Sequence, residues 1–468
     1  TITATVDGEL ITDTATVRFA TAEYPVQGGT TVIDCANYPT FQDKDIVIDG
    51  TLTINTAGCA PMSFGIVTIE PNSTLTHAAS TDTVTQSLDL IVDGLRVKPT
   101  GKIDVSGRGY LASSQSGVAG RTLGNGTAGG AGNGQGGSHG GYGGRDDIAR
   151  GAVYDDFRNP REPGAGAGWS PAGDRGDHGG GVVRITVRTG GSAVIDGAIA
   201  ADGEVRSSYG GGGAGGGIYL STPALYGAGT IHANGGDGHN SYSAGGGGGR
   251  VAIVGLTQEV GARFASSVVT GAVTAYGGYG NASTWAGAGS VYVEYPGDGS
   301  TGGRLYFDNG GHASRPGSTP LLSGLVGGVV DAVTSTTITD TDGGFYAGQL
   351  TGTLVTPKYP QGLDGFSDDL LLRVTANDTT TLTLDGNPTS VVHTPGVDAY
   401  RGVTRVQYLT VKGGARVDAG EGAVWITSGT PGDPLRYLLE GELTVDVLDL
   451  GPVSTIDVRN GGHLLIGT

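Results

Sequence analysis

The sequence predicts an all-β protein, a right-handed parallel β-solenoid with glycine-rich insertions and a small inserted antiparallel β module. Three observations predict this fold. Short runs of alternating or β-branched residues, closed by Gly, Asn or Asp, recur along the chain, and none has a helical period. A unit of strand, turn, glycine block and strand repeats at a nearly constant spacing. Glycine accounts for 92 of the 468 residues, and much of it falls at the same point of each repeat.

Residues 1–27 predict a β-hairpin, because apolar positions alternate on both sides of the turn at Asp7 and Gly8. The stretch "TATVDGELITDTATVRFA" resembles the closing strands of invasin-like, immunoglobulin-type repeats of bacterial surface proteins. This resemblance implies that the chain is an excerpt of a larger surface protein. The chain begins without Met and without a signal pattern, so either a leader was removed or this is a piece of something longer.

Residues 28–108 predict solenoid rungs, in runs such as "DIVIDGTLTI" and "GIVTIEPNSTLTH". Similar runs return in residues 406–468, for example "YLTVKGGARVDAG". Many short strands with regular turns fit either a β-sandwich or a solenoid. Self-similarity at a fixed period favours the solenoid.

Residues 109–310 contain the clearest repeats, and the first copy carries a long insertion at 109–180. The second strands of the repeat are spaced 33 to 40 residues apart. The arrangement "IDVSGRGY" then "GGSHGGYGG", followed by "GTIHANGGDG" and "GGGGGRVAI", resembles the glycine-rich β-solenoid repeats of very large secreted or surface-attached bacterial proteins. Adhesion or matrix roles are commonly inferred for that group. The first strands align on Ile103, Ile199, Ile231 and Val273, and the second strands on Val182, Ile218, Val251 and Val291.

The glycine blocks fit either a flexible linker or an ordered structure. The blocks at 210–217 and 245–249 keep the same register in each repeat and lead directly into a strand, which favours order. An extended helix with three residues per turn would let such backbones approach and hydrogen-bond laterally. The run "GNGQGGSHGGYGG" resembles the polyglycine-II bundles of some phage tail-tip adhesins. In such a helix Gly136, His139 and Tyr142 would share one edge.

Residues 311–405 break the repeat and predict an inserted antiparallel β module made of two hairpins with Asp-Gly turns. Asp340 and Asp342, in "DTDGG", supply clustered oxygen ligands of the kind that calcium prefers. These residues are also typical of ordinary turns. We expect no other cofactor than calcium.

Cys35 and Cys59 lie 24 residues apart, about the length of one solenoid coil. They are therefore expected to face each other on neighbouring rungs, either as a disulfide or as two buried thiols. A disulfide would indicate an oxidising compartment.

The formal net charge of −18, with scattered Asp and Glu, argues against nucleic acid or an anionic membrane as a partner. No run of about 18 apolar residues is present, so no membrane insertion is expected. Zinc-ligand spacing, the phosphate-binding "GxxxxGK" and a nucleophile elbow with a plausible triad are all missing from the sequence.

The insertion at 109–180 is the candidate functional site, because long loops on a rigid scaffold often carry binding or catalysis. Three hypotheses compete: a carbohydrate-binding surface, a polysaccharide lyase or glycoside hydrolase, and a salt-bridged structural loop. The candidate ligand-binding residues are His139, Tyr142, Arg145, Tyr154, Trp169, Asp174, Arg175 and His178. The catalytic residues of the enzyme hypothesis are Asp155, Asp156, Tyr154, His139 and Arg158.

These observations favour an extracellular or cell-surface bacterial protein with a structural or adhesive role. The expected partner is carbohydrate or another cell-surface ligand, and the ends of a solenoid can also stack into a fibre. The enzyme and an inert stalk or filament subunit remain the alternatives.

Overall fold

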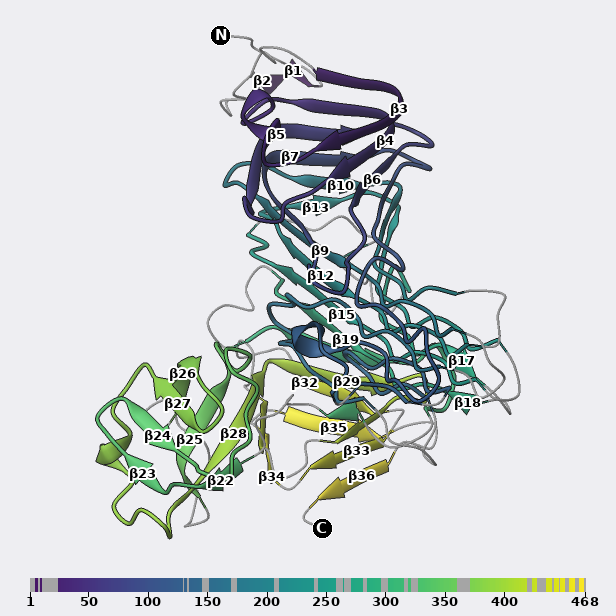
Figure 1. The fold of residues 1–468 in the computed structure, drawn as a ribbon. Coiled ribbons are helices and arrows are strands. Elements are labelled where there is room, and N and C mark those ends of the chain that lie inside the picture. Colours follow the sequence, from purple (N-terminus) through teal and green to yellow (C-terminus); the bar gives the residue numbers. More distant parts are fainter. Residues whose placement is uncertain are drawn as a thin grey trace.

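The computed structural model confirms the all-β class: nearly all its described regular elements are β-strands (Figure 1). Short 3-10 turns, η1 (Tyr38–Thr40), η2 (Leu123–Asn125) and η6 (Pro388–Ser390), lie in loops. The structure describes residues 5–6, 9–10, 24–128, 130–132, 134–144, 151–169, 175–205, 210–239, 243–257, 264, 271–280, 284–295, 302–314, 319–320, 327–359, 371–418, 423–426, 435–439, 442–445, 447–450, 454–458 and 463–466.

The N-terminal hairpin pairs β1 (Thr5–Val6) with β2 (Glu9–Leu10) in antiparallel register. Parallel strand pairing begins before residue 28, the predicted start of the solenoid rungs. Strand β3 (Tyr24–Ile33) already pairs in parallel with β4 (Ile46–Ile54) from Tyr24 onward.

Three ladders of parallel strands run down the N-terminal half of the molecule, and the chain visits them in turn. The first contains β5 (Met62–Ile69), β7 (Leu88–Val97), β9 (Val182–Val187), β12 (Gly217–Ser221), β15 (Arg250–Val254) and β19 (Ser290–Val293). The second contains β3, β4, β5, β7, β10 (Ala193–Ile195) and β13 (Leu225–Tyr226). The third contains β3, β4, β6 (Thr74–His77), β8 (Lys102–Asp104), β11 (Ala198–Ala200), β14 (Thr230–His232) and β16 (Val273–Thr274).

Stacked aliphatic side chains form the core between these ladders. The predicted alignment of the first strands is confirmed, since Ile103 pairs with Ile199, Ile199 with Ile231 and Ile231 with Val273. All four side chains are buried. Burying an isoleucine contributes about 2 to 3 kcal/mol, so one such column specifies register strongly.

In the first ladder, the predicted register between β9 and β12 is wrong by one residue. Ile218 pairs with Val183 and not with Val182. Both valines are buried, so the hydrophobic pattern at this point does not distinguish the two registers.

The main sheet is not parallel throughout. Among its described pairings, β19 with β20 (Arg304–Asp308) is antiparallel, and parallel pairing resumes beyond it. Three further parallel ladders follow: β20, β29 (Tyr408–Lys412), β32 (Leu435–Leu439) and β35 (Ser454–Val458); β21 (Thr319–Pro320), β30 (Arg416–Asp418), β33 (Glu442–Val445) and β36 (His463–Ile466); and β28 (Ala399–Val406), β31 (Ala423–Ile426) and β34 (Val447–Leu450).

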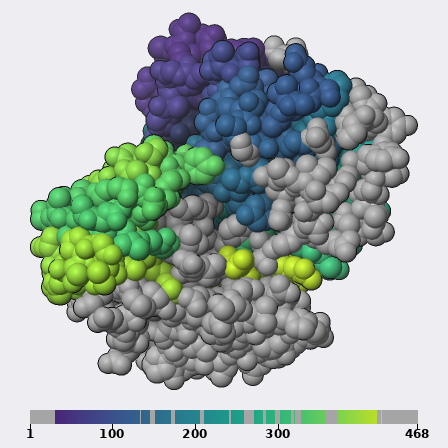
Figure 2. Space-filling view, turned by 60° about the horizontal axis from the view of Figure 1, so that its bottom comes forward, coloured from purple at the N-terminus to yellow at the C-terminus, as the bar shows by residue number. Residues whose placement is uncertain are grey.

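An antiparallel module interrupts the chain between β21 and β29 and bulges from one side of the molecule (Figures 1 and 2). Neither of the predicted Asp-Gly pairs, Asp342–Gly343 and Asp385–Gly386, forms the turn of a hairpin between described strands. One hairpin of the module turns at Asp378, whose Oδ1 accepts the N–H groups of Thr380 and Thr381. The strands are β22 (Gly327–Val329), β23 (Ala332–Val333), β24 (Thr337–Thr339), β25 (Leu354–Tyr359), β26 (Leu372–Asn377), β27 (Thr381–Leu384) and β28.

The glycine-rich segments leave the third ladder and return to the first, and they collect in a bundle beside the ladders (Figure 1). The segment 244–249 lies inside this bundle and hydrogen-bonds to several neighbouring segments. The N–H groups of Ala244 and Gly247 donate to Gly134 and Gly137 of one neighbour. Every third peptide therefore points to the same neighbour.

The other peptides of this segment follow the same period. The N–H groups of residues 246 and 249 donate to residues 236 and 233 of a second neighbour. The carbonyl groups of 244 and 247 accept from 212 and 215, and those of 245 and 248 accept from 144 and 141. In addition, the N–H of residue 278 donates to the carbonyl of 246, and the N–H of 248 donates to the carbonyl of 287. The glycine block is thus ordered by lateral hydrogen bonds in this structure.

Glycine is required here because of close backbone approach. A Cβ on Gly247 would lie 2.0 Å from the carbonyl oxygen of Gly141, and one on Gly213 would lie 1.8 Å from that of His178. Real Cβ atoms do not approach an oxygen so closely, so any side chain would force the segments apart.

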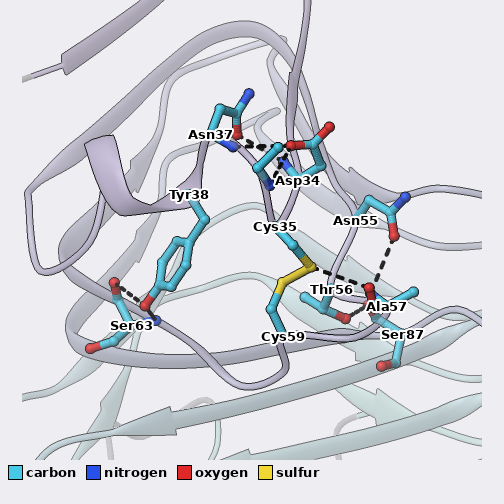
Figure 3. Close-up of a disulfide and its surroundings, with 11 residues drawn as sticks. Asp34, Cys35, Asn37, Tyr38, Asn55, Thr56, Ala57, Cys59, Ser63 and Ser87 are labelled. Carbon is cyan, nitrogen blue, oxygen red and sulfur yellow. Dashed lines mark hydrogen bonds between the residues drawn. A yellow bond between two sulfur atoms is a disulfide. The ribbon is translucent and has the colours of Figure 1, made fainter.

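Cys35 and Cys59 form a disulfide with a Cα–Cα distance of 5.7 Å (Figure 3). It joins the loop after β3 to the loop after β4, on consecutive coils. Next to it, the hydroxyl of Tyr38 accepts the N–H of Ser63 at 2.6 Å, and the Tyr38 ring packs edge-on against Phe64. These contacts fasten the loop 34–44 to the first coils.

Candidate functional site

The central part of the insertion, residues 151–163, packs across the outer face of the first ladder. The Arg184 guanidinium, on β9, lies 4.5 Å from the ring centroid of Tyr219 and donates to Asn159 Oδ1 at 2.9 Å. Farther along, Phe157 packs edge-on against Tyr292 of β19, with ring centroids 5.5 Å apart. The face that β9, β12, β15 and β19 present is therefore covered by the chain itself.

His139 lies at the centre of the insertion, between the glycine bundle and this loop. Its Nδ1 is 2.8 Å from the carbonyl oxygen of Gly215, and its Nε2 is 3.3 Å from Oδ2 of Asp155. Both partners are acceptors, so the ring satisfies both contacts when both nitrogens carry protons. Tyr154 stacks obliquely on the imidazole at 4.8 Å and donates its hydroxyl to the carbonyl of Pro163.

Asp155 adopts a left-handed backbone conformation with φ of 73°, which aims its carboxylate back into the loop. Besides His139, its Oδ2 accepts the N–H groups of Arg161 and Glu162 at 2.9 and 3.0 Å. Burial alone would raise the pKa of Asp155, but the hydrogen bond and charge of His139, with the N–H of Glu162, hold the pKa below its usual range. The Asp155 carboxylate is thus charged, and its hydrogen-bond partners all belong to the fold.

Arg250 closes the cluster from the first ladder. Its guanidinium is 1% exposed and donates Nε to the carbonyl of Tyr154 at 2.9 Å and Nη1 to Ser290 Oγ at 3.1 Å. Burial lowers the pKa of Arg250, and the nearby carboxylates of Asp155 and Asp156 counteract this. A second contact links Tyr110 to Glu162, whose Oε2 accepts the Tyr110 hydroxyl at 2.6 Å. We call Tyr110, His139, Tyr154, Asp155, Glu162 and Arg250 the His139 cluster.

The structure brings together three of the predicted site residues, but away from solvent. His139, Tyr154 and Asp155 are 0%, 1% and 7% exposed, and each polar group has a partner within the fold. A polysaccharide cannot reach these side chains as they are placed. Their geometry corresponds to the third hypothesis, a structural loop held by internal polar contacts.

Asp156 and Arg158 flank this cluster. Asp156 is half-buried, its Oδ1 accepts the N–H of Arg158, and burial raises its pKa. The Arg158 guanidinium lies 4.3 Å from the Phe157 ring centroid and donates to the carbonyl of Arg405 on β28. Asp155 and Asp156 lie in a loop, as a catalytic pair of adjacent residues would require, but Asp155 is committed to other partners.

The remaining predicted ligand-binding residues lie apart from the cluster. Tyr142 and Trp169 are half-buried, and their carbonyls accept the N–H groups of bundle glycines. Arg175 Nη1 lies 2.9 Å from His178 Nε2, while His178 Nδ1 accepts the N–H of Ala112. Arg145 and Asp174 lie outside the described residues.

The expected calcium ligands are differently engaged. Asp340 is buried, and its Oδ2 accepts the Tyr400 hydroxyl at 2.8 Å, while Asp342 is exposed. Across the part of the chain that the structure describes, no group of three or more His, Cys, Asp or Glu side chains could hold a metal ion. Calcium binding at these residues stays a prediction.

A cluster of aromatic rings, in which Tyr279 and His312 are exposed and Trp285 is half-buried, was not predicted as a site. Tyr279 and Trp285 pair across the hairpin of β17 (Tyr279–Gly280) and β18 (Thr284–Trp285), with ring centroids 5.3 Å apart. His312 stacks on Trp285 at 3.7 Å, with the planes within 8°. We call these three residues the aromatic corner. Sequence reasoning missed it because His312 approaches from a distant loop.

No protein-family model matches the chain, and no curated protein matches its sequence. Within the described residues, no helix is long and apolar enough to cross a membrane.

Proposed function

We propose that this chain is a rigid extracellular element of a bacterial surface adhesin, fibre or matrix protein. In this proposal it is a right-handed β-solenoid braced by a polyglycine-II-like bundle. The parallel ladders, with neighbouring strands separated by one coil, support the solenoid. The Cys35–Cys59 disulfide supports an oxidising, extracellular compartment.

One observation carries the proposal: the three-residue period with which residues 244–249 hydrogen-bond to their neighbours. Three residues per turn and lateral hydrogen bonds are the geometry expected of packed extended glycine helices. Between β11 and β19, each passage from the third ladder back to the first sends two segments into this bundle, so bending the ladders there would break bonds in the bundle. The glycine bundle thereby stiffens the parallel ladders.

The enzyme hypothesis has less support than the scaffold. The carboxylate and imidazole on which it depends, Asp155 and His139, are buried and paired with each other. A general acid or base must lie within hydrogen-bonding distance of a substrate, and two buried side chains that bond to each other provide no such access.

Amide hydrogen exchange of the whole chain, followed by mass spectrometry, tests the scaffold. We expect amides of residues 244–249 to exchange as slowly as those of β12 and β15. Exchange at the rate of an unstructured chain would contradict the proposal, because a slack glycine linker cannot brace the ladders. A second experiment incubates the whole chain overnight with neutral and uronate-rich polysaccharides. Shortening of any polymer would favour the enzyme hypothesis.

A further inference from the structure

The aromatic corner includes the hairpin of β17 and β18, which lies on the outer side of the glycine bundle (Figure 1). Tyr279 is 40% exposed, and His312 is also exposed. Trp285 lies between them, stacked on His312 and in edge contact with Tyr279. Trp285 itself is half-buried, so the rings of Tyr279 and His312 are the exposed ones, and Trp285 joins them.

The corner is held in place before any ligand arrives. Asn309 is fully buried, and its Nδ2 donates to the carbonyls of Ala286 and His312 at 3.1 and 2.9 Å. The same side chain accepts the N–H of Gly277 through Oδ1. The side-chain amide of Asn309 therefore joins the segment of Trp285 to the loop of His312. Because the protein already holds the rings in place, binding a ligand would cost little side-chain or loop entropy.

Polar groups border the exposed ring of Tyr279. The N–H of Tyr279 donates to Oδ1 of Asp237 at 2.7 Å, and its carbonyl accepts the N–H of Gly238 at 2.7 Å. Asp237 and the next side chain, His239, are exposed. An exposed carboxylate that accepts a hydrogen bond thus lies at the backbone of Tyr279, whose ring is 40% exposed.

We propose that the aromatic corner binds a neutral saccharide. Aromatic rings stack on the apolar face of a sugar, while a neighbouring carboxylate accepts its hydroxyl protons. Nucleic-acid bases also stack on aromatic rings, but the net charge of −18 disfavours a polyanion, and it disfavours uronate-rich polymers for the same reason. The inference rests on the proposed adhesive function and names its ligand class.

Native gel electrophoresis of the whole chain in gels containing a soluble polysaccharide tests the proposal. We expect a neutral glucan, mannan or galactan to retard the protein, and alginate or pectin not to retard it. Tyr279→Ala and His312→Ala should each weaken the retardation about tenfold or more. Tyr346→Ala is the matched control, because Tyr346 is 46% exposed but lies in the antiparallel module.

Several results would overturn the inference: no retardation by any neutral polymer, equal retardation by alginate or by an oligothymidylate, or unchanged retardation of both variants. His312 is exposed and sits on a loop, so His312→Ala keeps the test informative if Tyr279→Ala fails to fold. Slow amide exchange without saccharide binding would reject this site and leave the scaffold standing. Fast amide exchange in the glycine bundle together with saccharide binding would reject the scaffold and leave this site standing.

Discussion

Nε2 of His139 lies 3.3 Å from Oδ2 of Asp155, and both side chains are enclosed by the fold. The contact joins two parts of the insertion that have different structures. His139 belongs to a glycine segment and also bonds to Gly215 of the next coil, whereas Asp155 organises the loop 151–163. This contact fastens the loop to the bundle, and removing the Asp155 carboxylate would also leave the buried Arg250 guanidinium with less opposite charge nearby.

Asp155→Asn tests this role of the pair. Asparagine tolerates the left-handed backbone conformation of this position and can still accept the N–H groups of Arg161 and Glu162. The variant therefore removes the charge and one acceptor, because its amide nitrogen would face the N–H of Asp156, which Oδ1 of Asp155 accepts at 2.9 Å. We expect the free energy of unfolding to fall by about 3 kcal/mol, because the imidazole of His139 and the guanidinium of Arg250 remain buried. Chemical denaturation measures the loss.

Asp342→Asn is the control for that measurement, since Asp342 is exposed and should change stability by less than about 0.5 kcal/mol. Equal stability of Asp155→Asn and wild type would show that the pair contributes nothing. The lowered pKa of Asp155 adds a pH signature. Its stabilisation is present above the unfolded value near 4 and disappears as the pH falls through the folded pKa, so Asp155→Asn should lack this acid-induced loss.

His77 predicts a second pH dependence, at higher pH. Burial lowers its pKa from 6.5 to about 4, and the ring is neutral in the fold: Nδ1 donates to the carbonyl of Ala78 and Nε2 accepts the N–H of Val182. The unfolded chain binds a proton between pH 6.5 and 4 that the folded chain does not bind. Stability should therefore be complete above pH 6.5 and fall by about 3 kcal/mol as the pH decreases to 4.

Denaturation at pH 7 and pH 4.5 checks this dependence. His77→Gln does not titrate in this range and should lose less stability than wild type on acidification. His393→Gln, at an exposed position, should behave as wild type. If His77→Gln and wild type lose stability in parallel, another group is responsible for the loss.

The ladders could be predicted from sequence because their determinants are local and repeated. Each repeat places an aliphatic residue at the same point before a turn, and the register of Ile103, Ile199 and Ile231 follows from that. The neighbouring Val182 and Val183 show the limit of this reasoning. Two adjacent buried valines leave the register open, and the backbone pairing decides it.

The candidate site could not be predicted in the same way. The sequence shows which charged and aromatic residues the insertion contains, but their exposure depends on partners far along the chain. Arg250 reaches Tyr154 across 96 residues, and Gly215 reaches His139 across 76. Sequence patterns contain no information about such pairs. The aromatic corner has the same origin, because His312 reaches Trp285 through a loop beyond the repeat.

Gly247→Ala tests whether the bundle depends on close backbone approach. The new methyl group would lie 2.0 Å from the carbonyl oxygen of Gly141, so two segments must separate and lose lateral hydrogen bonds. We expect the free energy of unfolding to decrease by about 3 kcal/mol. Amide exchange should also become faster in residues 141–144.

Gly132→Ala is the matched control, because a Cβ there meets nothing within 4 Å. It should leave stability unchanged or raise it slightly, since alanine restricts the unfolded chain more than glycine does. Equal effects of the two substitutions would contradict the close packing of segment 244–249.

The disulfide predicts a local effect of reduction at the N-terminal coils. The Cys35–Cys59 bond closes a loop of 24 residues, for which loop entropy gives about 3 kcal/mol of stabilisation. Each coil contacts mainly its neighbours, so reduction should increase amide exchange in β3 and β4 and leave the module from Gly327 to Val406 unchanged. The double variant Cys35→Ser with Cys59→Ser should reproduce the reduced state and not respond to reductant. Unchanged exchange of β3 on reduction would mean that Tyr38 and the neighbouring loop contacts hold the first coils without the covalent bond.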